Sequence, residues 1–234
     1  MATADAALPQ ADALPVGPRA NLPYRLVRLI AVPLLRLAFR FEVHGRENIP
    51  RKRGPNYIVV ANHLNWPDEF TLLLLFPIEP RLHFLADPTV LVTRKVQWFL
   101  VRTTGGYVPV VKSRHADQTL YHHVDRALAL GGAVAIFPEG QYGTAEGELL
   151  PFHKGFAHFA IKAGVPVVPV GLSGCKDVWF RKKIRMFVGE PIPSAGQDPA
   201  ALTELAHERV RALVPPYVEP AGPKPLRKFL THLF

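Results

Sequence analysis

Short apolar runs alternate with helix-like stretches along most of the chain. Runs rich in Val and Ile predict strands at 57–62, 82–87, 105–110, 133–137, 165–172 and 184–189. Apolar residues spaced three and four apart predict helices at 68–76, 90–102, 115–132, 156–164 and 199–214. Uniformly apolar strands that alternate with helices are typical of a buried sheet with helices on both faces. The pattern therefore predicts an α/β fold with a mostly parallel or mixed central sheet.

Two prolines interrupt the predicted strand at 165–172. Pro166 and Pro169 cannot donate a hydrogen bond to a neighbouring strand. We expect this strand to lie at an edge of the sheet or to carry a bulge.

The N-terminal helical segment, residues 21–41, mixes bulky apolar residues with four arginines, Arg25, Arg28, Arg36 and Arg40. Such a pattern suits a helix that lies in a membrane interface with its guanidinium groups at the phosphates. A helix packed on the domain with its arginines in water fits equally well. The expected site of action is the cytoplasmic face of a membrane, with the protein held there peripherally or monotopically.

The C-terminal segment, residues 215–234, repeats this pattern. One apolar stripe is formed by Leu226, Phe229, Leu230 and Leu233, and Arg227, Lys228 and His232 lie off it. Residues 1–20 are predicted to be a flexible lead-in with no secretory signal, and residues 42–214 to be the folded domain. No apolar stretch reaches the roughly 20 residues of a membrane-spanning helix.

The composition favours an anionic partner. The chain of 234 residues has 28 Lys and Arg against 19 Asp and Glu, a net charge of +9. No run of aromatic and basic residues resembles a nucleic-acid motif, so we expect an anionic membrane surface and no nucleic acid. The single cysteine, Cys175, excludes an internal disulfide. Four scattered histidines are expected on the surface and no metal site is predicted: His115, His122, His123 and His153.

The stretch VVANHLNWPDEF carries a candidate base. His63 follows an apolar strand, and Pro67 favours a helix that begins there with Asp68 in its first turn. A turn between them lets the carboxylate hold one imidazole nitrogen and leave the other free to accept a proton. Alternatively, Asp68 stabilises a helix N-terminus and His63 caps a loop. Because no serine nucleophile motif occurs, we expect any nucleophilic hydroxyl to belong to the substrate.

Two further stretches carry candidate binding residues. In IFPEGQYG, Glu139 follows a buried strand and is expected to orient a polar substrate, together with Gly140, Gln141 and Tyr142. Alternatively, Glu139 caps the following turn. In TTGGYVPVVKSR, Lys112 and Arg114 are a candidate phosphate site, although basic residues on a solvated loop fit equally well.

Taken in order, NHLNWPD, GGYVPVVK, IFPEG and VPVVPVGL resemble four sequence blocks of the glycerolipid acyltransferases, the 1-acylglycerol-3-phosphate acyltransferase family. The resemblance runs from about Phe41 to Ile192. It implies an O-acyltransferase of phospholipid biosynthesis that forms no acyl-enzyme. His63 would deprotonate an acceptor hydroxyl that attacks an acyl thioester, and Asp68 would orient His63.

The resemblance also implies the remaining substrates. Glu139 and Gly140 would help hold the acceptor head, and Lys112 would stand where the family usually has a phosphate-binding arginine. No cofactor would be bound. The donor would be acyl-coenzyme A or acyl-carrier protein, and the acceptor a lysolipid reached from the membrane surface.

The chain departs from the family pattern at three positions. Asn65 stands in place of a usual serine, Tyr142 in place of an arginine, and Lys112 lacks the arginine fork. Asn65 is still expected on the substrate side. A non-phosphate acceptor such as a glycolipid or aminolipid is therefore an alternative, and so is a catalytically silent lipid-binding protein. Thioester hydrolysis, with water as acceptor, is a further possibility.

Overall fold

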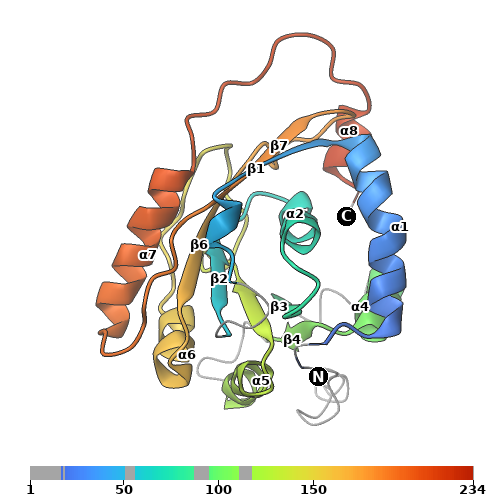
Figure 1. The fold of residues 1–234 in the computed structure, drawn as a ribbon. Coiled ribbons are helices and arrows are strands. Elements are labelled where there is room, and N and C mark those ends of the chain that lie inside the picture. Colours follow the sequence, from blue (N-terminus) through green and yellow to red (C-terminus); the bar gives the residue numbers. More distant parts are fainter. Residues whose placement is uncertain (1–16, 18, 51–55, 87–94, 111–117, 234) are drawn as a thin grey trace, which may run out of the picture.

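The computed structural model describes the chain except residues 1–16, 18, 51–55, 87–94, 111–117 and 234 (Figure 1). Most of the predicted lead-in lies outside the described residues. The described part forms one seven-stranded sheet of order β1-β7-β6-β2-β5-β3-β4. The strands are β1 (Arg40–His44), β2 (Ile58–Ala61), β3 (Leu82–Ala86), β4 (Tyr107–Pro109), β5 (Ala133–Ile136), β6 (Val167–Ser173) and β7 (Lys183–Val188).

The sheet is mixed, as predicted. Strand β2 pairs in parallel with β5 and β6, and β3 pairs in parallel with β4 and β5. Strand β7 pairs antiparallel with β6 and parallel with β1, so β1 and β7 run opposite to the other strands. The start of β1 therefore lies at the same edge of the sheet as the end of β2.

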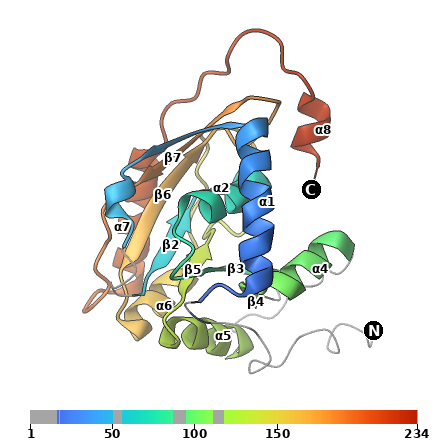
Figure 2. The ribbon, with the colours of Figure 1, turned by 45° about the vertical axis from the view of Figure 1, so that its right-hand side comes forward.

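Helices cover both faces of this sheet (Figures 1 and 2). They are α1 (Leu22–Ala38), α2 (Pro67–Leu75), α4 (Lys95–Thr104), α5 (Gln118–Ala129), α6 (Gly155–Ala163), α7 (Pro199–Leu213) and α8 (Arg227–Thr231), with a short 3-10 helix η3 (Arg46–Asn48). The side chains of β2 point alternately to the two faces of the sheet. Val59 and Ala61 join the core beneath α1 and α2, whereas Ile58 and Val60 join the core beneath α5, α6 and α7.

Strand β1 was not predicted. The helix expected through residue 41 ends at Ala38, and Phe39 has extended dihedrals and is 2% exposed. The following Arg40–His44 strand alternates over only five residues, and it begins among the arginines that suggested a continuing helix. Pairing with β7, which lies over a hundred residues away in sequence, decides its conformation.

The expectation of an edge position for β6 is wrong, because β7 and β2 flank it. The pairing does contain a bulge, but it lies on the partner of β6 and not in β6 itself. Ile192 lies opposite Val167 and Val188 lies opposite Val170. Between these two pairs β6 advances by three positions and its partner by four, so the partner carries one extra residue. Pro169 lies within this irregularity and still accepts a hydrogen bond from Gly189 N at its carbonyl (2.9 Å).

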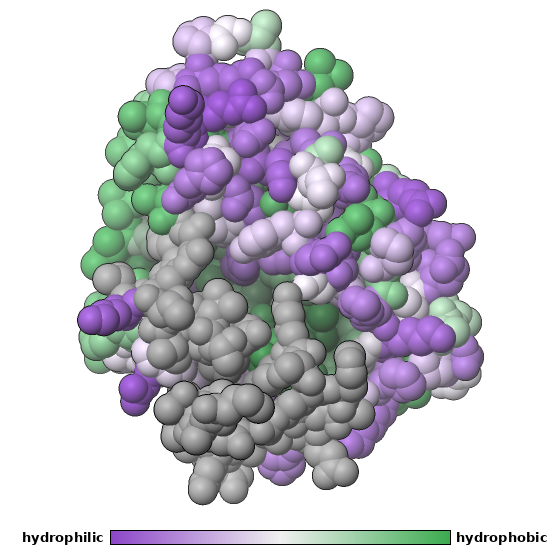
Figure 3. Space-filling model, turned by 180° about the vertical axis from the view of Figure 1, so that it is seen from behind, coloured by the Kyte–Doolittle hydropathy of each residue, from purple (hydrophilic) through white to green (hydrophobic). Residues whose placement is uncertain are grey.

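Helix α1 exposes one apolar stripe along its length. Its exposed residues are Leu22, Leu26, Leu29, Ile30, Leu34 and Leu37. Figure 3 shows apolar surface along the edge where α1 lies, on the left in that view. Within the described residues no helix is both long and apolar enough to cross a membrane.

The predicted C-terminal stripe is divided between two environments. Helix α8 is short, and within it Leu230 is buried in the core while Phe229 is exposed. Leu226 and Leu233, which flank the helix, are also exposed. The stripe therefore does not form one face, because α8 packs against the rest of the protein along the Leu230 side.

Candidate active site

The candidate base follows directly from the end of β2. Asn62, the residue before His63, is fully buried and its side chain bridges to β6. Its Nδ2 donates to Leu172 O (3.0 Å) and its Oδ1 accepts from Leu172 N (2.7 Å). This pair of bonds fixes the point at which the chain leaves the sheet.

The turn after β2 brings His63 onto Asp68. Nδ1 of His63 lies 2.9 Å from Oδ2 of Asp68, which is fully buried. The same Oδ2 accepts from the backbone N–H groups of Leu64 (2.5 Å) and Asn65 (3.0 Å). Asp68 therefore holds both the ring and the backbone of the turn, and Pro67 starts α2 where the sequence indicated.

Two aromatic rings enclose the imidazole. Phe137, just after β5, stacks on His63 with ring centroids 3.9 Å apart. Tyr142 packs against it at 4.3 Å with a tilt of 55°. The His63 side chain keeps 14% exposure, so the ring is largely but not fully enclosed.

The charges around His63 favour its protonated form. Burial of the ring opposes protonation, but the hydrogen bond to Asp68 and the negative charges of Glu69, Asp68 and Glu139 outweigh it and raise the pKa of His63. A base with a raised pKa is a stronger proton acceptor once it is neutral.

Glu69 is a site residue that the sequence analysis missed. Its Oε1 lies 3.8 Å from His63 Nε2, the nitrogen that Asp68 leaves free. Burial raises the pKa of this carboxyl to about 7, although 34% of the side chain stays exposed. Its place directly after Asp68 in the first turn of α2 was the only available signal.

Glu139 is bound to backbone on both sides. One carboxylate oxygen accepts from His63 N (2.7 Å) and the other from Leu150 N (2.8 Å). The residue is 4% exposed, and its burial raises its pKa. Glu139 thus ties the His63 turn to the 139–150 loop.

The loop after Glu139 reaches the His63 turn. Gly140 has φ +69°, a left-handed conformation that favours glycine, and an added Cβ would come 3.2 Å from the His153 ring. Gly143 N donates to His63 O (2.7 Å). Gln141 is exposed and Tyr142 is 49% exposed, so both border the open side of the loop.

Asn65, another predicted binding residue, belongs to the turn that carries His63. Asn65 Nδ2 donates to the carbonyl oxygens of Lys176 (2.9 Å) and Thr231 (3.0 Å), and its Oδ1 accepts from Trp66 N (2.8 Å). Asn65 thus joins its turn to the C-terminal segment. Lys112 and Arg114 lie outside the described residues.

The cysteine is beside the pair but is a poor nucleophile. Cys175 is buried, and its burial and the negative charge of Asp68 raise the pKa of the thiol well above its usual value. Among the described residues no group of three or more His, Cys, Asp or Glu side chains is arranged to hold a metal ion.

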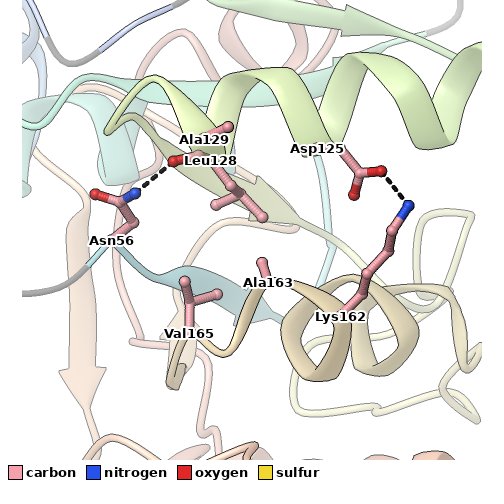
Figure 4. A pocket seen from close by; sticks show the side chains of 7 residues that line it. All are labelled: Asn56, Asp125, Leu128, Ala129, Lys162, Ala163 and Val165. Atoms are coloured by element: carbon pink, nitrogen blue, oxygen red, sulfur yellow. Dashed lines mark hydrogen bonds and ion pairs between the residues drawn. The ribbon is translucent and has the colours of Figure 1, made fainter.

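The pocket in Figure 4 belongs to another part of the molecule. It has a volume of about 370 Å³ and is lined by Asn56, Asp125, Leu128, Ala129, Lys162, Ala163 and Val165. Asn56 precedes β2, whereas His63 follows it, so the two lie at opposite ends of that strand. An ion pair between Lys162 and Asp125 (2.5 Å) spans the pocket.

Residues 40–173 match the protein family described as Acyltransferase, and this range contains His63, Asp68 and Glu139. The chain belongs to this family. The expectation of an O-acyltransferase is therefore confirmed at the level of the family, and so is the resemblance on which it was based.

Individual relatives agree with this assignment. The human 1-acyl-sn-glycerol-3-phosphate acyltransferase alpha is 26% identical over 201 residues, which cover 80% of this chain and 67% of the relative. The 1-acyl-sn-glycerol-3-phosphate acyltransferase of Bacillus subtilis is 25% identical, with 77% of this chain and 91% of the relative covered. The crystal structure of the acyltransferase PlsC from Thermotoga maritima matches with a TM-score of 0.62 at 25% identity, over 81% of this chain and 80% of that one. This Acyltransferase family member therefore shares its fold with PlsC.

Proposed function

We propose that this Acyltransferase family member transfers a fatty acyl group from an acyl thioester to a lysolipid hydroxyl, with 1-acylglycerol-3-phosphate as the first acceptor to test. The observation that carries the proposal is the contact of 2.9 Å between His63 Nδ1 and the buried Asp68 carboxylate. The names of the relatives support the choice of acceptor.

The chemistry needs one base and no enzyme nucleophile. With its Nδ1–H donated to Asp68, His63 has a lone pair at Nε2 that accepts the proton of the acceptor hydroxyl. The hydroxyl oxygen attacks the thioester carbonyl and forms a tetrahedral intermediate. That intermediate then collapses, the carbon–sulfur bond breaks, and the thiolate takes the proton back from the imidazolium. An oxygen ester and a free thiol result.

Glu139, Gly140 and Tyr142 contribute by position in this proposal. Glu139 holds the backbone of His63 while Gly140 provides the left-handed turn after it. The exposed side of the Tyr142 ring, packed on His63, is then the surface against which an acceptor head would lie. The donor is coenzyme A or acyl-carrier protein, and no cofactor takes part.

The acceptor would be reached from a membrane surface on the cytoplasmic side. The exposed stripe of α1 is continuous, and the chain carries a net charge of +9. Such a helix lies in the plane of an anionic interface without crossing it. The protein is therefore proposed to bind the membrane peripherally through α1.

A non-phosphate acceptor is the second candidate, and Glu69 is the observation that favours it. A carboxylate 3.8 Å from the His63 Nε2 repels a phosphate next to the reacting hydroxyl, while it attracts an ammonium group or accepts from a hydroxyl. Tyr142, in place of the family's usual arginine, offers a ring and a hydroxyl to a sugar or neutral head.

The decisive experiment is a mass-spectrometric screen of the purified protein. One acyl-coenzyme A and one acyl-carrier protein are each offered with lysophosphatidic acid, other lysophospholipids, lysoglycolipids and lyso-aminolipids. We expect transfer to at least one acceptor and a loss on the order of a hundredfold or more in His63→Ala, since general bases contribute at least that much. His158→Ala, an exposed histidine of α6, is the control and should keep full activity.

The outcomes separate the candidates. Transfer to lysophosphatidic acid alone excludes the non-phosphate acceptor, and transfer to neutral or aminolipid acceptors alone excludes the first choice. Thiol release without an acylated lipid indicates hydrolysis. Vesicle binding without turnover of any thioester would leave a lipid-binding protein and contradict the proposal.

A further inference from the structure

A second pocket lies at the end of α1, and four arginines line it. Its volume is about 360 Å³, and its lining residues are Arg36, Phe39, Arg40, Phe41, Val43, Arg46, Leu75 and Arg181. We call it the arginine pocket. No carboxylate contributes to its lining, so its rim is entirely cationic in charge.

The four arginines have no acidic partner in the described part of the chain. Other arginines of the protein do form ion pairs, as Arg25 does with Glu79 and Arg227 with Asp177 (2.9 Å). Of these four arginines, only Arg181 makes a side-chain hydrogen bond within the described residues, and its Nη1 donates to the carbonyl oxygens of Arg36 and Leu37 at 3.3 Å. Like charges held together without a counter-charge favour an external anion.

The floor of the arginine pocket is apolar. Phe39 is 2% exposed and packs its ring against Phe41 and Trp66 at centroid distances of 6.3 and 6.1 Å. Val43 and Leu75 complete this floor. A ligand that fits both parts has an anionic group for the rim and a hydrocarbon portion for the floor, which is the chemistry of an amphiphile.

The location of the pocket indicates which amphiphile is available. Arg36 comes seven residues after Leu29, so the two lie about 20° apart around α1, and Arg36 borders the exposed stripe. Arg40 begins β1 two residues after the helix ends. Arg181 has φ +66°, uncommon for a residue with a side chain, and its N–H donates to Ala38 O, which fixes it at the helix end. Arginines at the border of an apolar stripe lie at the depth of lipid phosphates.

We propose that the arginine pocket binds the phosphate of an anionic membrane phospholipid, with its glycerol and upper acyl carbons on the phenylalanine floor. Guanidinium groups bind phosphate oxygens in pairs, which makes arginine better suited to this role than lysine. The proposal rests on the membrane docking put forward above, and it adds a specific head-group site to it. Such a site orients the protein so that α1 lies on the bilayer.

Vesicle sedimentation tests this assignment with the full-length protein. Binding is measured to phosphatidylcholine vesicles with and without phosphatidylglycerol, for the wild type and for the double variant Arg36→Gln/Arg181→Gln. We expect the double variant to bind phosphatidylglycerol vesicles roughly tenfold or more weakly, because each basic group near an anionic surface contributes appreciably. Its binding to phosphatidylcholine should be unchanged, since the α1 stripe is intact.

The matched control removes the same charge elsewhere. Arg209 and Arg211 are exposed on α7, on the other side of the sheet, and Arg209→Gln/Arg211→Gln should bind phosphatidylglycerol as the wild type does. An equal loss in both double variants would show only net charge and would overturn the site. Competition by inorganic phosphate that abolishes binding to phosphatidylglycerol would also overturn it, because it would point to a free anion.

An assay of acyl transfer to a detergent-dispersed acceptor distinguishes a failure of the lipid site from a failure of the proposed function. We expect the Arg36→Gln/Arg181→Gln variant to keep its KM for acyl-coenzyme A in this assay. A raised KM with unchanged vesicle binding would assign the pocket to the donor phosphates and overturn the lipid assignment. If the wild type transfers nothing, the proposed function fails, while the difference between the two double variants still decides the lipid site.

Discussion

Two consecutive carboxylates act on different nitrogens of one imidazole. Asp68 lies 2.9 Å from Nδ1 of His63, and Glu69 lies 3.8 Å from Nε2. Asp68 is fully buried and accepts two further backbone N–H groups, so its position is fixed. Glu69 is partly exposed and makes no comparable set of bonds. Its expected effect is therefore on the pKa of His63 and not on the position of the ring.

The pH dependence of transfer is expected to reveal Glu69. In the proposed mechanism His63 accepts a proton only when it is neutral, so kcat/KM should rise with pH through the pKa of His63, which lies above its ordinary value. Glu69→Gln removes a negative charge that stabilises the protonated imidazole. The variant should therefore reach its plateau at a lower pH than the wild type.

A pH profile of kcat/KM for both proteins makes this measurement. Because the pKa of Glu69 is itself about 7, its charge is present mainly in the upper part of the range, where the two profiles should differ most. Glu204→Gln, an exposed carboxylate on α7, is the control and should leave the profile unchanged. If the rise of kcat/KM occurs at the same or a higher pH in Glu69→Gln than in the wild type, the interaction between Glu69 and His63 would be refuted.

At the scale of elements, the C-terminal helix α8 supports the His63 turn. Trp66 Nε1 donates to Leu230 O (2.8 Å) and Asn65 Nδ2 to Thr231 O (3.0 Å). Thr231 in turn accepts from Val178 N (3.0 Å) and donates to Val178 O (3.1 Å) through its hydroxyl. The backbone of α8 is thus fixed on both sides, and one of those sides is the turn that carries the base.

Thr231→Val tests whether this support matters for catalysis. The substitution keeps the shape of the side chain but removes both hydrogen bonds to Val178. The Thr231 backbone, whose carbonyl accepts from Asn65, then loses this anchor. We expect kcat to fall by between several-fold and about a hundredfold, because small misplacements of reacting groups are costly. KM should change little, since the substitution acts on the position of the His63 turn and not on a proposed substrate contact.

The control is the same substitution, threonine to valine, at a position away from the His63 turn. Thr203 is 7% exposed on α7, and its hydroxyl donates to Pro199 O (2.7 Å). Thr203→Val should lower the free energy of unfolding by about 1 kcal/mol, as loss of a single hydrogen bond does, with kcat unchanged. Equal kcat values for the two variants at equal Tm would mean that α8 has no positioning role.

At the scale of the whole molecule, the sequence patterns predicted those features of the fold that residues close together in the sequence determine. The alternation of apolar runs and helical periods predicted an α/β fold with a mostly parallel or mixed sheet, because the central strands β2, β5 and β6 bury both faces. The turn between β2 and α2 was predictable as well, since Pro67 starts a helix and Asp68 follows His63 by five positions. The spacing gave no indication of Glu69, because its distance to His63 Nε2 depends on the rotation of α2 about its axis.

Features that join distant segments could not be predicted. The arginine pocket gathers residues from α1, β1, the end of α2 and the turn before β7, and only the folded sheet brings them together. Asn65 was expected to contact substrate, but its partners are backbone carbonyls over a hundred residues away. Strand β1 likewise depends on β7, so its five residues carried too little periodicity to be recognised.

The exposed stripe of α1 gives the last prediction, which concerns the orientation of the whole protein. Leu29 is 70% exposed near the middle of the stripe, and an isolated molecule leaves its side chain in water. Leu29→Ser should weaken binding to phosphatidylcholine vesicles by roughly tenfold, since burying a leucine side chain is worth about 1.5–3 kcal/mol and an interface buries it in part.

Leu130→Ser is the matched control, because Leu130 is 47% exposed just beyond α5 at the other side of the molecule. If α1 faces the bilayer, vesicle sedimentation should separate the two variants, with Leu130→Ser binding as the wild type does. Loss of binding in Leu130→Ser, with none in Leu29→Ser, would place the membrane against the opposite face. The arginine pocket would then point away from the lipid phosphates, so this one measurement constrains both membrane proposals.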